Sequence, residues 1–273
     1  MVFQLALQNT PINSLITRSR VTIFIIGLLM LSWGMHIPDG YLSPQTFIPL
    51  WGIMLPIWAK ASRVLKTTLR TRHVPLFAMS AAFSFVIMMF NVPTPGGTTG
   101  HATGAALVSI LLGPWAAVLA VSAALIVQAL LFGDGGITAI GANCFNMGVV
   151  IPFVGFLIYR LLTRGIRPMS RRIVAASAVA AYVGVNTSAL VTALELGVQP
   201  WISRSTMGNP LYCPFPLNVT VPAMVGSHLL VFGILEALLT SGVILYLQKA
   251  DPLLLTLMNP EVETRRAAPN PTG

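Results

Sequence analysis

The chain is short of charged residues, and this shortage decides the class of protein. Only 8% of its 273 residues are charged and just seven are acidic, while 55% are hydrophobic and the mean hydropathy is +0.80. A soluble domain carries about 25% charged residues, so too little polar surface is present here to cover a water-soluble globule. The apolar runs are long and unbroken, unlike the alternating segments of about ten residues in a transmembrane β-barrel. We therefore expect an all-α polytopic membrane protein.

Motifs for nucleotide binding and for disulfide frameworks are also missing or scarce. No GxxxxGK[ST] phosphate loop occurs in the sequence, so ATP-driven transport would need an ATPase in another chain, and no enzyme is expected. The two cysteines, Cys144 and Cys213, form neither a CxxC pair nor a metal-type cluster. A disulfide between them stays open, although two unrelated cysteines are the favoured interpretation.

The net charge of +9 comes from basic residues that are gathered in three places. Lys60, Arg63, Lys66, Arg70 and Arg72 lie in one hydrophilic connection, Arg160, Arg164, Arg167, Arg171 and Arg172 in another, and Lys249, Arg265 and Arg266 near the end of the chain. Clusters of this kind mark the cytoplasmic side of membrane proteins. The basicity therefore indicates topology, and no nucleic-acid partner is expected.

Seven hydrophobic segments follow residue 35, approximately at 45–59, 74–90, 102–112, 115–132, 137–159, 173–195 and 220–247. Gly113-Pro114 separates the short third segment from the fourth, so these two are expected to form a bent or partly inserted pair. With residue 35 outside, an odd number of spans puts the basic clusters in the cytoplasm and leaves only Arg204 outside. We expect about seven transmembrane helices, with the mature N-terminus outside and the C-terminus in the cytoplasm.

Residues 1–34 have the pattern of a signal peptide. Arg18 and Arg20 precede an apolar run at 21–31, about eleven residues long and short of the roughly twenty that a span needs. Ser32 and Gly34 place small residues at the −3 and −1 positions of a cut before Met35. An uncleaved anchor helix and translation from Met35 remain alternatives. The expected organisation is a signal peptide or anchor at 1–34, a transmembrane domain at 35–249 and a short cytoplasmic tail at 250–273.

Few polar groups outside the basic clusters are candidates for chemistry. Glu195 and Glu236 lie in apolar segments, where an acid either has a function or bridges helices. Asp134 lies in the turn FGDGG and is expected to cap the next helix. His36 and His101 both fall in outer loops, where solvated surface histidines are the more common interpretation.

His36 becomes the second residue of the chain if cleavage occurs before Met35, and that position has specific coordination chemistry. The free Met35 amine and the His36 amide nitrogen close a five-membered chelate on a metal, and that amide with the imidazole Nδ1 closes a six-membered one. The imidazole of His101 would add a fourth nitrogen. Four nitrogens in a plane favour Ni(II) or Cu(II), and Co(II) also accepts nitrogen ligands. Because the amide must lose its proton, affinity should fall as the pH falls.

Three stretches carry a resemblance to a known family. All three closely resemble sequences of the CbiM/NikM family: MHIPDGYLSP (35–44), the run 91–150 and SHLLVFGILEALLT (227–240). The run 91–150 contains the motifs PGGT-x-GH, LLGPWAA, QALLF-x-DGG and GAN-x-x-NMG. Members of the family are the substrate-capture (S) components of energy-coupling-factor (ECF) type cobalt/nickel ABC importers. The resemblance covers Met35 to about Lys249.

The resemblance implies a seven-helix bundle in a bacterial or archaeal plasma (inner) membrane, with Co(II) or Ni(II) as the transported substrate and no organic cofactor. It implies metal ligands from Met35, His36 and His101. Five further residues are candidates to orient these ligands: Asn91, Thr98, Thr99, Asn143 and Asn146. The implied partners are a transmembrane coupling (T) protein, two ATPase subunits and a small accessory membrane subunit.

Two other functions remain as alternatives. An ECF-type capture component for an organic vitamin would share the helical architecture but would have no use for a free amine at Met35. An independent secondary transporter or channel would use Glu195 and Glu236 as its working residues. The ligand set serves cobalt and nickel alike, so it does not choose between them.

Overall fold

The computed structural model describes residues 36–68, 74–94, 98–166, 169–252 and 254–256, with the backbone alone at 92–94 and 98–99. The chain divides into two units, 1–34 and 35–273, and all described residues belong to the second. The predicted signal peptide, Met35, Arg70, Arg72 and most of the predicted tail lie outside the described residues.

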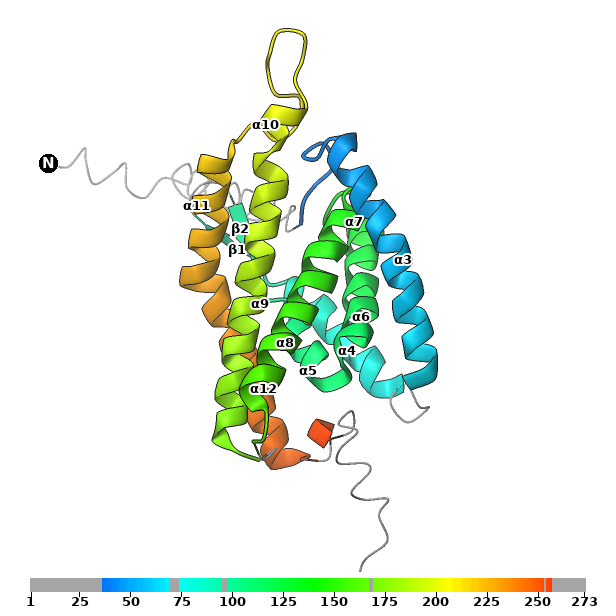
Figure 1. The fold of residues 1–273 in the computed structure, drawn as a ribbon, viewed down its shortest axis with the longest axis vertical. Coiled ribbons are helices and arrows are strands. Elements are labelled where there is room, and N and C mark those ends of the chain that lie inside the picture. The colour runs from blue at the N-terminus through cyan, green and yellow to red at the C-terminus, as the bar shows by residue number, and fades with distance from the viewer. Residues whose placement is uncertain (1–35, 69–73, 95–97, 167–168, 253, 257–273) are drawn as a thin grey trace, which may run out of the picture. The chain divides into compact units, whose positions relative to one another are not determined.

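Most of the described residues are helical (Figure 1). In chain order the structure has α3 (Pro44–Thr68), α4 (Val74–Met88), β1 (Val92–Thr94), β2 (Thr98–Gly100), α5 (Ala105–Leu112), α6 (Pro114–Val127), η2 (Gln128–Phe132), α7 (Ile140–Asn143), η3 (Cys144–Val150), α8 (Ile151–Thr163), α9 (Arg171–Gly197), α10 (Gln199–Ile202), α11 (Leu217–Ser227), η4 (His228–Phe232), α12 (Gly233–Ala250) and η5 (Leu254–Thr256). The segments η2, η3 and η4 are π-helical turns that continue neighbouring α-helices, and η5 is a 3₁₀ turn.

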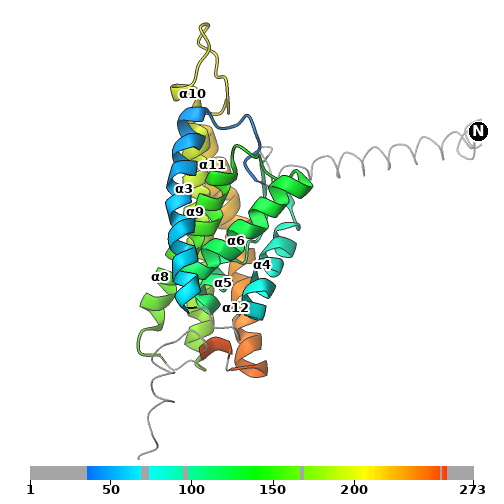
Figure 2. The ribbon, with the colours of Figure 1, turned by 90° about the vertical axis from the view of Figure 1, so that its right-hand side faces the viewer.

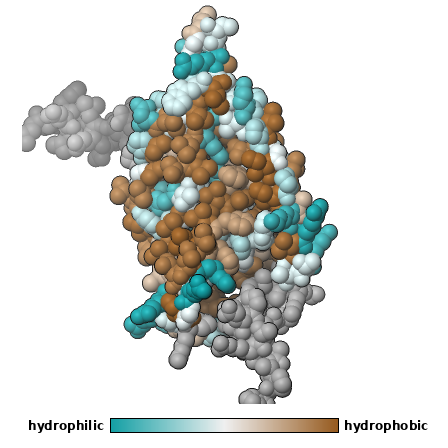
Figure 3. All heavy atoms as spheres, in the orientation of Figure 1, coloured by the Kyte–Doolittle hydropathy of each residue, from teal (hydrophilic) through white to brown (hydrophobic). Residues whose placement is uncertain are grey.

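Four helical runs are long and apolar enough to cross a membrane. Within the described residues these are Pro114–Phe132, Ile140–Thr163, Arg171–Ile202 and Leu217–Ala250, while Val74–Met88 is a shorter apolar helix. The face in Figure 3 is mostly hydrophobic, with hydrophilic groups gathered towards its ends. A helical membrane protein is therefore supported, and the count of seven spans stays a prediction.

The first helix extends further than the hydropathy pattern predicts. Lys60, Arg63 and Lys66 were expected in a hydrophilic connection, but all three lie within α3, which continues to Thr68. Lysine and arginine favour helical backbone, and their long stems can cover apolar surface while the charge stays in water. Hydropathy therefore located the end of the apolar stretch and misplaced the end of the helix.

The predicted break at Gly113-Pro114 is present. Gly113 has φ of +83°, a conformation that glycine adopts without strain. Pro114 is the first residue of α6, where its missing N–H removes no helical hydrogen bond. Helices α5 and α6 pack against each other as a bent pair.

Helix α9 is the centre of packing, with α8, α11 and α12 all packed against it (Figure 1; Figure 2 gives the view from the side of α3). Small residues make the closest approach: a Cβ at Gly184 would lie 3.1 Å from the carbonyl oxygen of Ile151 on α8. Close backbone contact through small residues is the usual basis of helix packing in membranes. Cys144 and Cys213 are both buried and free, so the structure favours the interpretation of two unrelated cysteines.

The predicted loop at 91–104 contains a short antiparallel hairpin. Val92 pairs with Gly100 and Thr94 with Thr98. His101 follows the second strand directly, and α5 begins four residues later. The hairpin therefore places His101 between a strand end and a helix start.

Candidate metal centre

The segment from His36 to Ser43 lies across the turns that connect η2 to α7. Asn143 bonds both backbone groups of Ile37: its Oδ1 accepts from the Ile37 N–H at 3.0 Å, and its Nδ2 donates to the Ile37 carbonyl at 3.1 Å. The Gly136 N–H also donates to the Ile37 carbonyl, at 2.9 Å. Asn143, one of the predicted orienting residues, thus satisfies both backbone groups of Ile37, as a neighbouring strand would in a sheet, and fixes the residue that follows His36.

Asp39 ties the same segment to the start of α7. Its carboxylate accepts from the backbone N–H of Ile137 at 3.0 Å and of Thr138 at 2.8 Å, and from the Thr138 hydroxyl. Partial burial by itself would raise the pKa of Asp39, but these hydrogen bonds outweigh it and lower the pKa below its usual value. The Asp39 carboxylate is therefore charged at neutral pH and holds the segment firmly.

Two glycines let the segment approach. A Cβ at Gly136 would overlap the backbone of Pro38 and Asp39. Gly135 has φ of +93°, and a Cβ added to it would lie only 3.0 Å from the Cβ of His36. The DGG motif therefore forms the surface against which residues 36–43 pack.

Asp134 has a different place from the predicted one. Instead of capping a helix it lies buried beside His36, whose Nδ1 is 3.3 Å from Asp134 Oδ1 and 3.4 Å from the Asp134 carbonyl oxygen. The two residues are 98 positions apart in sequence, so no local turn rule reveals the contact. The signal that could have indicated it is the pair of glycines that follow Asp134, because such glycines permit close approach of another segment.

His36 and His101 are brought together. Their rings meet edge to face, with centroids 5.0 Å apart and planes at 80°. Each residue is 6% exposed, and His36 Nε2 has no hydrogen-bond partner among the described residues. Imidazole nitrogens are donors that suit Ni(II), but no three His, Cys, Asp or Glu side chains among the described residues are arranged to hold a metal ion by themselves.

Burial has a strong effect on His101. Desolvation, followed by the charge of nearby His36, lowers the pKa of His101 to about 3, although its Nδ1 contact with the Ala102 carbonyl at 3.2 Å acts in the opposite direction. The imidazole is therefore neutral at physiological pH and has a lone pair free for a metal.

The other predicted orienting residues are less closely connected to the histidines. Asn146 donates to Glu195 Oε2 at 2.7 Å, and none of its described hydrogen bonds reaches either histidine. Asn91 precedes β1 and has a buried Oδ1 without a hydrogen-bond partner among the described residues. Thr98 and Thr99 lie in β2, and their side chains fall outside the described part of the chain. Glu236 is fully buried and bonds the loop after His101.

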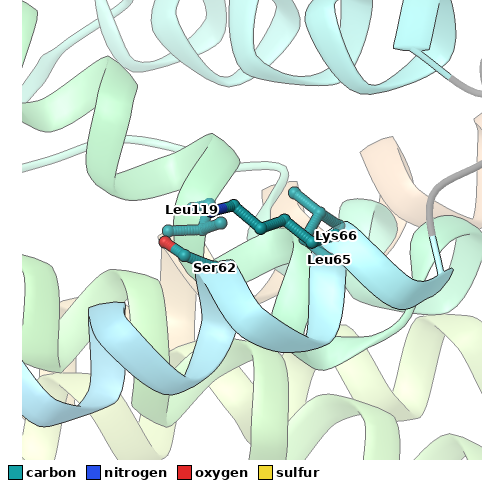
Figure 4. A pocket seen from close by; sticks show the side chains of 4 residues that line it. All are labelled: Ser62, Leu65, Lys66 and Leu119. Carbon is teal, nitrogen blue, oxygen red and sulfur yellow. The ribbon is translucent and has the colours of Figure 1, made fainter.

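A separate hollow lies at the other end of α3. Ser62, Leu65 and Lys66 line it with Leu119 of α6, and its volume is about 350 Å³ (Figure 4). Ser62 is roughly 27 Å along the helix from Pro44 at a rise of 1.5 Å per residue. The hollow is therefore not part of the histidine site.

The chain as a whole is similar to known proteins. The family CbiM, described as the cobalt uptake substrate-specific transmembrane region, matches residues 36–254. The chain belongs to the CbiM family. Its resemblance to CbiM/NikM sequences is thereby confirmed.

Relatives within the CbiM family have transport names. The chain is 52% identical to the fused nickel transport protein NikMN of Rhodobacter capsulatus over 81% of this chain and 64% of that one. It is 48% identical to a putative metal transport protein of Methanocaldococcus jannaschii (84% and 98%) and 32% identical to the cobalt transport protein CbiM of Geobacter sulfurreducens (88% and 69%). The chain spans about two thirds of the length of the fused nickel transport proteins that it matches, 64% and 66% in two cases.

A solved structure shares the fold. A truncated transition metal transporter is 51% identical, with a TM-score of 0.74 over 78% of this chain and 98% of that one. A second crystal structure, of a transition metal transporter, has the same identity and TM-score over 79% and 93%. At this identity the likeness extends beyond the general fold to the family itself.

Proposed function

We propose that the chain is the membrane-embedded substrate-capture component of an ECF-type importer for Co(II) or Ni(II). One observation carries the proposal: two buried imidazoles, His36 and His101, lie 5.0 Å apart beside the buried carboxylate of Asp134. The relatives named as nickel and cobalt transport proteins support the two metals as substrates, and they do not choose between them.

The metal is captured by the processed N-terminus. After cleavage before Met35, the Met35 amine and the His36 amide and Nδ1 supply three nitrogens, and neutral His101 supplies the fourth. Asn143 and Asp39 hold the segment behind these donors, so little ordering is required when the metal arrives.

Asp134 takes part in metal binding through its contact with His36. The predicted donor Nδ1 of His36 lies against the Asp134 carboxylate. Binding replaces this contact by the metal, and the carboxylate remains beside a divalent cation whose charge it helps to neutralise. Loss of the His36 amide proton adds a second negative charge to the site.

Transport needs other chains. We propose a transmembrane coupling protein, two ATPase subunits and a small accessory membrane subunit as partners in the plasma membrane, with the metal site facing outwards and the C-terminus in the cytoplasm. The three basic clusters support this orientation through the positive-inside rule.

The proposal is tested by two measurements, the mass of the mature protein and its affinity for Ni(II) or Co(II). The expected mass begins at Met35, and the protein with that terminus binds Ni(II) or Co(II) tightly. Acetylating the terminus or adding one residue before Met35 should abolish tight binding while leaving the helical content intact. An intact residue 1 in the membrane protein, or wild-type affinity in the blocked protein, would contradict the proposal. Tight binding of an organic vitamin would favour the alternative capture component.

A further inference from the structure

We infer that Glu236, on the last helix, is a positioning residue that holds the metal ligand His101. This inference rests on the proposed metal site and adds to it a contact from a helix that carries no proposed ligand. None of the described hydrogen bonds of Glu236 reaches His101; Glu236 acts through Thr103 and Gly104, two and three residues after that histidine.

The carboxylate of Glu236 grips the loop just after His101. Its Oε2 accepts from the backbone N–H of Thr103 at 2.6 Å and of Gly104 at 3.3 Å, and its Oε1 accepts from the Thr103 hydroxyl at 3.2 Å. The Thr103 hydroxyl in turn accepts from the N–H of Ala105, the first residue of α5. A buried carboxylate in an apolar segment is costly unless its oxygens are bonded in this way.

The same helical run also holds the residue just before His101. Phe232, one turn before Glu236, is 0% exposed, and its ring fills the space where a Cβ of Gly100 would lie. Gly100 and Thr103 are therefore both fixed by η4 and α12, which leaves His101 between two clamped positions. A displacement of this helix would move His101 with it.

A purely structural role for Glu236 makes a different prediction. If the carboxylate only caps the start of α5, its removal lowers stability but leaves His101 able to ligate. If it positions His101, its removal changes the coordination of the metal, and the change disappears when His101 is already absent. A double-mutant cycle separates the two roles.

The experiment measures Ni(II) affinity and the visible absorption of bound Ni(II) in the mature protein with residue 35 as its terminus. We expect Glu236→Ala to weaken binding by about 10- to 100-fold, as loss of a residue behind a metal ligand commonly does, and to shift the absorption of the planar site. Glu236→Gln keeps an acceptor oxygen for the two backbone N–H groups and should lie closer to wild type. In a His101→Ala background, where the N-terminal donors still bind Ni(II) weakly, Glu236→Ala should change nothing.

The control is Thr240→Ala, one turn further along α12. Thr240 is as buried as Glu236, and its hydroxyl bonds no atom among the described residues. This variant should bind Ni(II) as the wild type does. An equal loss from Glu236→Ala in both backgrounds, or no loss in the wild-type background, would overturn the inference.

A second pair of variants covers the case in which Glu236→Ala does not fold. Gly100→Ala puts a methyl group into the Phe232 ring and should weaken Ni(II) binding, and Phe232→Leu in the same chain, which keeps an apolar side chain against residue 100 but frees space for the methyl group, should restore part of it. No rescue, or no loss from Gly100→Ala, would refute the clamp. If the wild-type mature protein binds neither Ni(II) nor Co(II), the proposed function itself is refuted. If the wild type binds metal and the variants bind it equally well, only the role of Glu236 is refuted.

Discussion

At the scale of the residue, the centre depends on placing polar groups where water is excluded. His101 is 6% exposed, with the ring of His36 beside it, and this environment keeps its imidazole neutral. Asp134 puts a carboxylate against the other imidazole. A neutral His101 imidazole in a site that also contains the Asp134 carboxylate suits a divalent cation, because this donor carries no proton that the metal must first displace.

The pKa of His101 predicts a pH dependence of stability in the metal-free protein. The folded state holds this pKa at about 3, whereas an unfolded histidine titrates near 6.5. Between these values the unfolded chain binds a proton that the folded chain does not, so the free energy of unfolding falls as the pH drops from about 6.5 towards 3. His101→Gln, which cannot take up the proton, should lose less stability than wild type between pH 6.5 and 4.5. Thermal unfolding of the metal-free proteins across this range is the measurement, and parallel curves would contradict the assignment.

The charge of Asp134 should matter for metal and not for folding. Asp134→Asn keeps the size and an acceptor oxygen for His36 but removes the negative charge beside the cation. We expect Ni(II) affinity to fall by about tenfold or more with little change in melting temperature, as measured by titration and thermal unfolding. Asp251→Asn, which removes the same charge after the end of α12, is the control and should bind as wild type does. Equal affinities for the two variants would count against the role of Asp134.

At the scale of the element, the site is a seat for an extended segment. Residues 36–43 form no helix or strand, and they are held by the side chains of Asn143 on α7, Gln199 on α10 and Thr138 in the turn before α7. The seat is tight at Gly136, where the backbone of Asp39 leaves no room for a Cβ. The geometry of His36 therefore depends on a loop between two helical runs.

Gly136→Ala should disrupt this seat. Its methyl group would overlap Pro38 and Asp39, so we expect the segment to move and metal affinity to fall at least tenfold, while the helical content stays unchanged. Gly242→Ala is the matched control, since a Cβ at Gly242 meets no atom within 4 Å. That change in the interior of α12 should leave binding intact and raise stability by about 0.5–1 kcal/mol. Isothermal titration with Ni(II) and circular dichroism check the pair, and unaltered binding by Gly136→Ala would show that the seat is not needed.

At the scale of the whole molecule, the central question is how the helices are oriented in the membrane. Four runs among the described residues are long and apolar enough to span it, and the seven-span prediction adds α3, α4 and α5. The basic residues of α3, the 160–172 region and the end of α12 all belong on one side if that prediction holds.

Cysteine labelling tests the orientation. Met207 is 88% exposed in the connection between α10 and α11, so Met207→Cys should react with a membrane-impermeant maleimide on intact cells. Lys249→Cys, near the end of α12, should react only after the membrane is opened. The wild-type protein serves as control, because both native cysteines are buried. Labelling of both variants on intact cells would mean an even number of spans between them and a wrong topology.

Much of the outline followed from hydropathy and charge. The shortage of charged residues indicated a helical membrane protein, and Gly113-Pro114 marked the break between α5 and α6. Position along the chain also singled out His36, because a histidine that becomes the second residue of the chain can form chelate rings with the terminal amine. His101 was identified as the imidazole that could supply the fourth nitrogen. The end of α3 was misplaced, since helix formation does not stop where hydrophobicity does.

The amino-acid sequence by itself determined the class of protein, the apolar segments and the candidate donor residues, because these depend on composition and on neighbours along the chain. Tertiary structure alone decided that Asp134 lies against His36, 98 residues away, and that Glu236 holds Thr103, 133 residues away. Such contacts join a loop to a loop or a loop to a distant helix. They depend on how elements far apart in the sequence pack together, and no local propensity or periodicity records that packing.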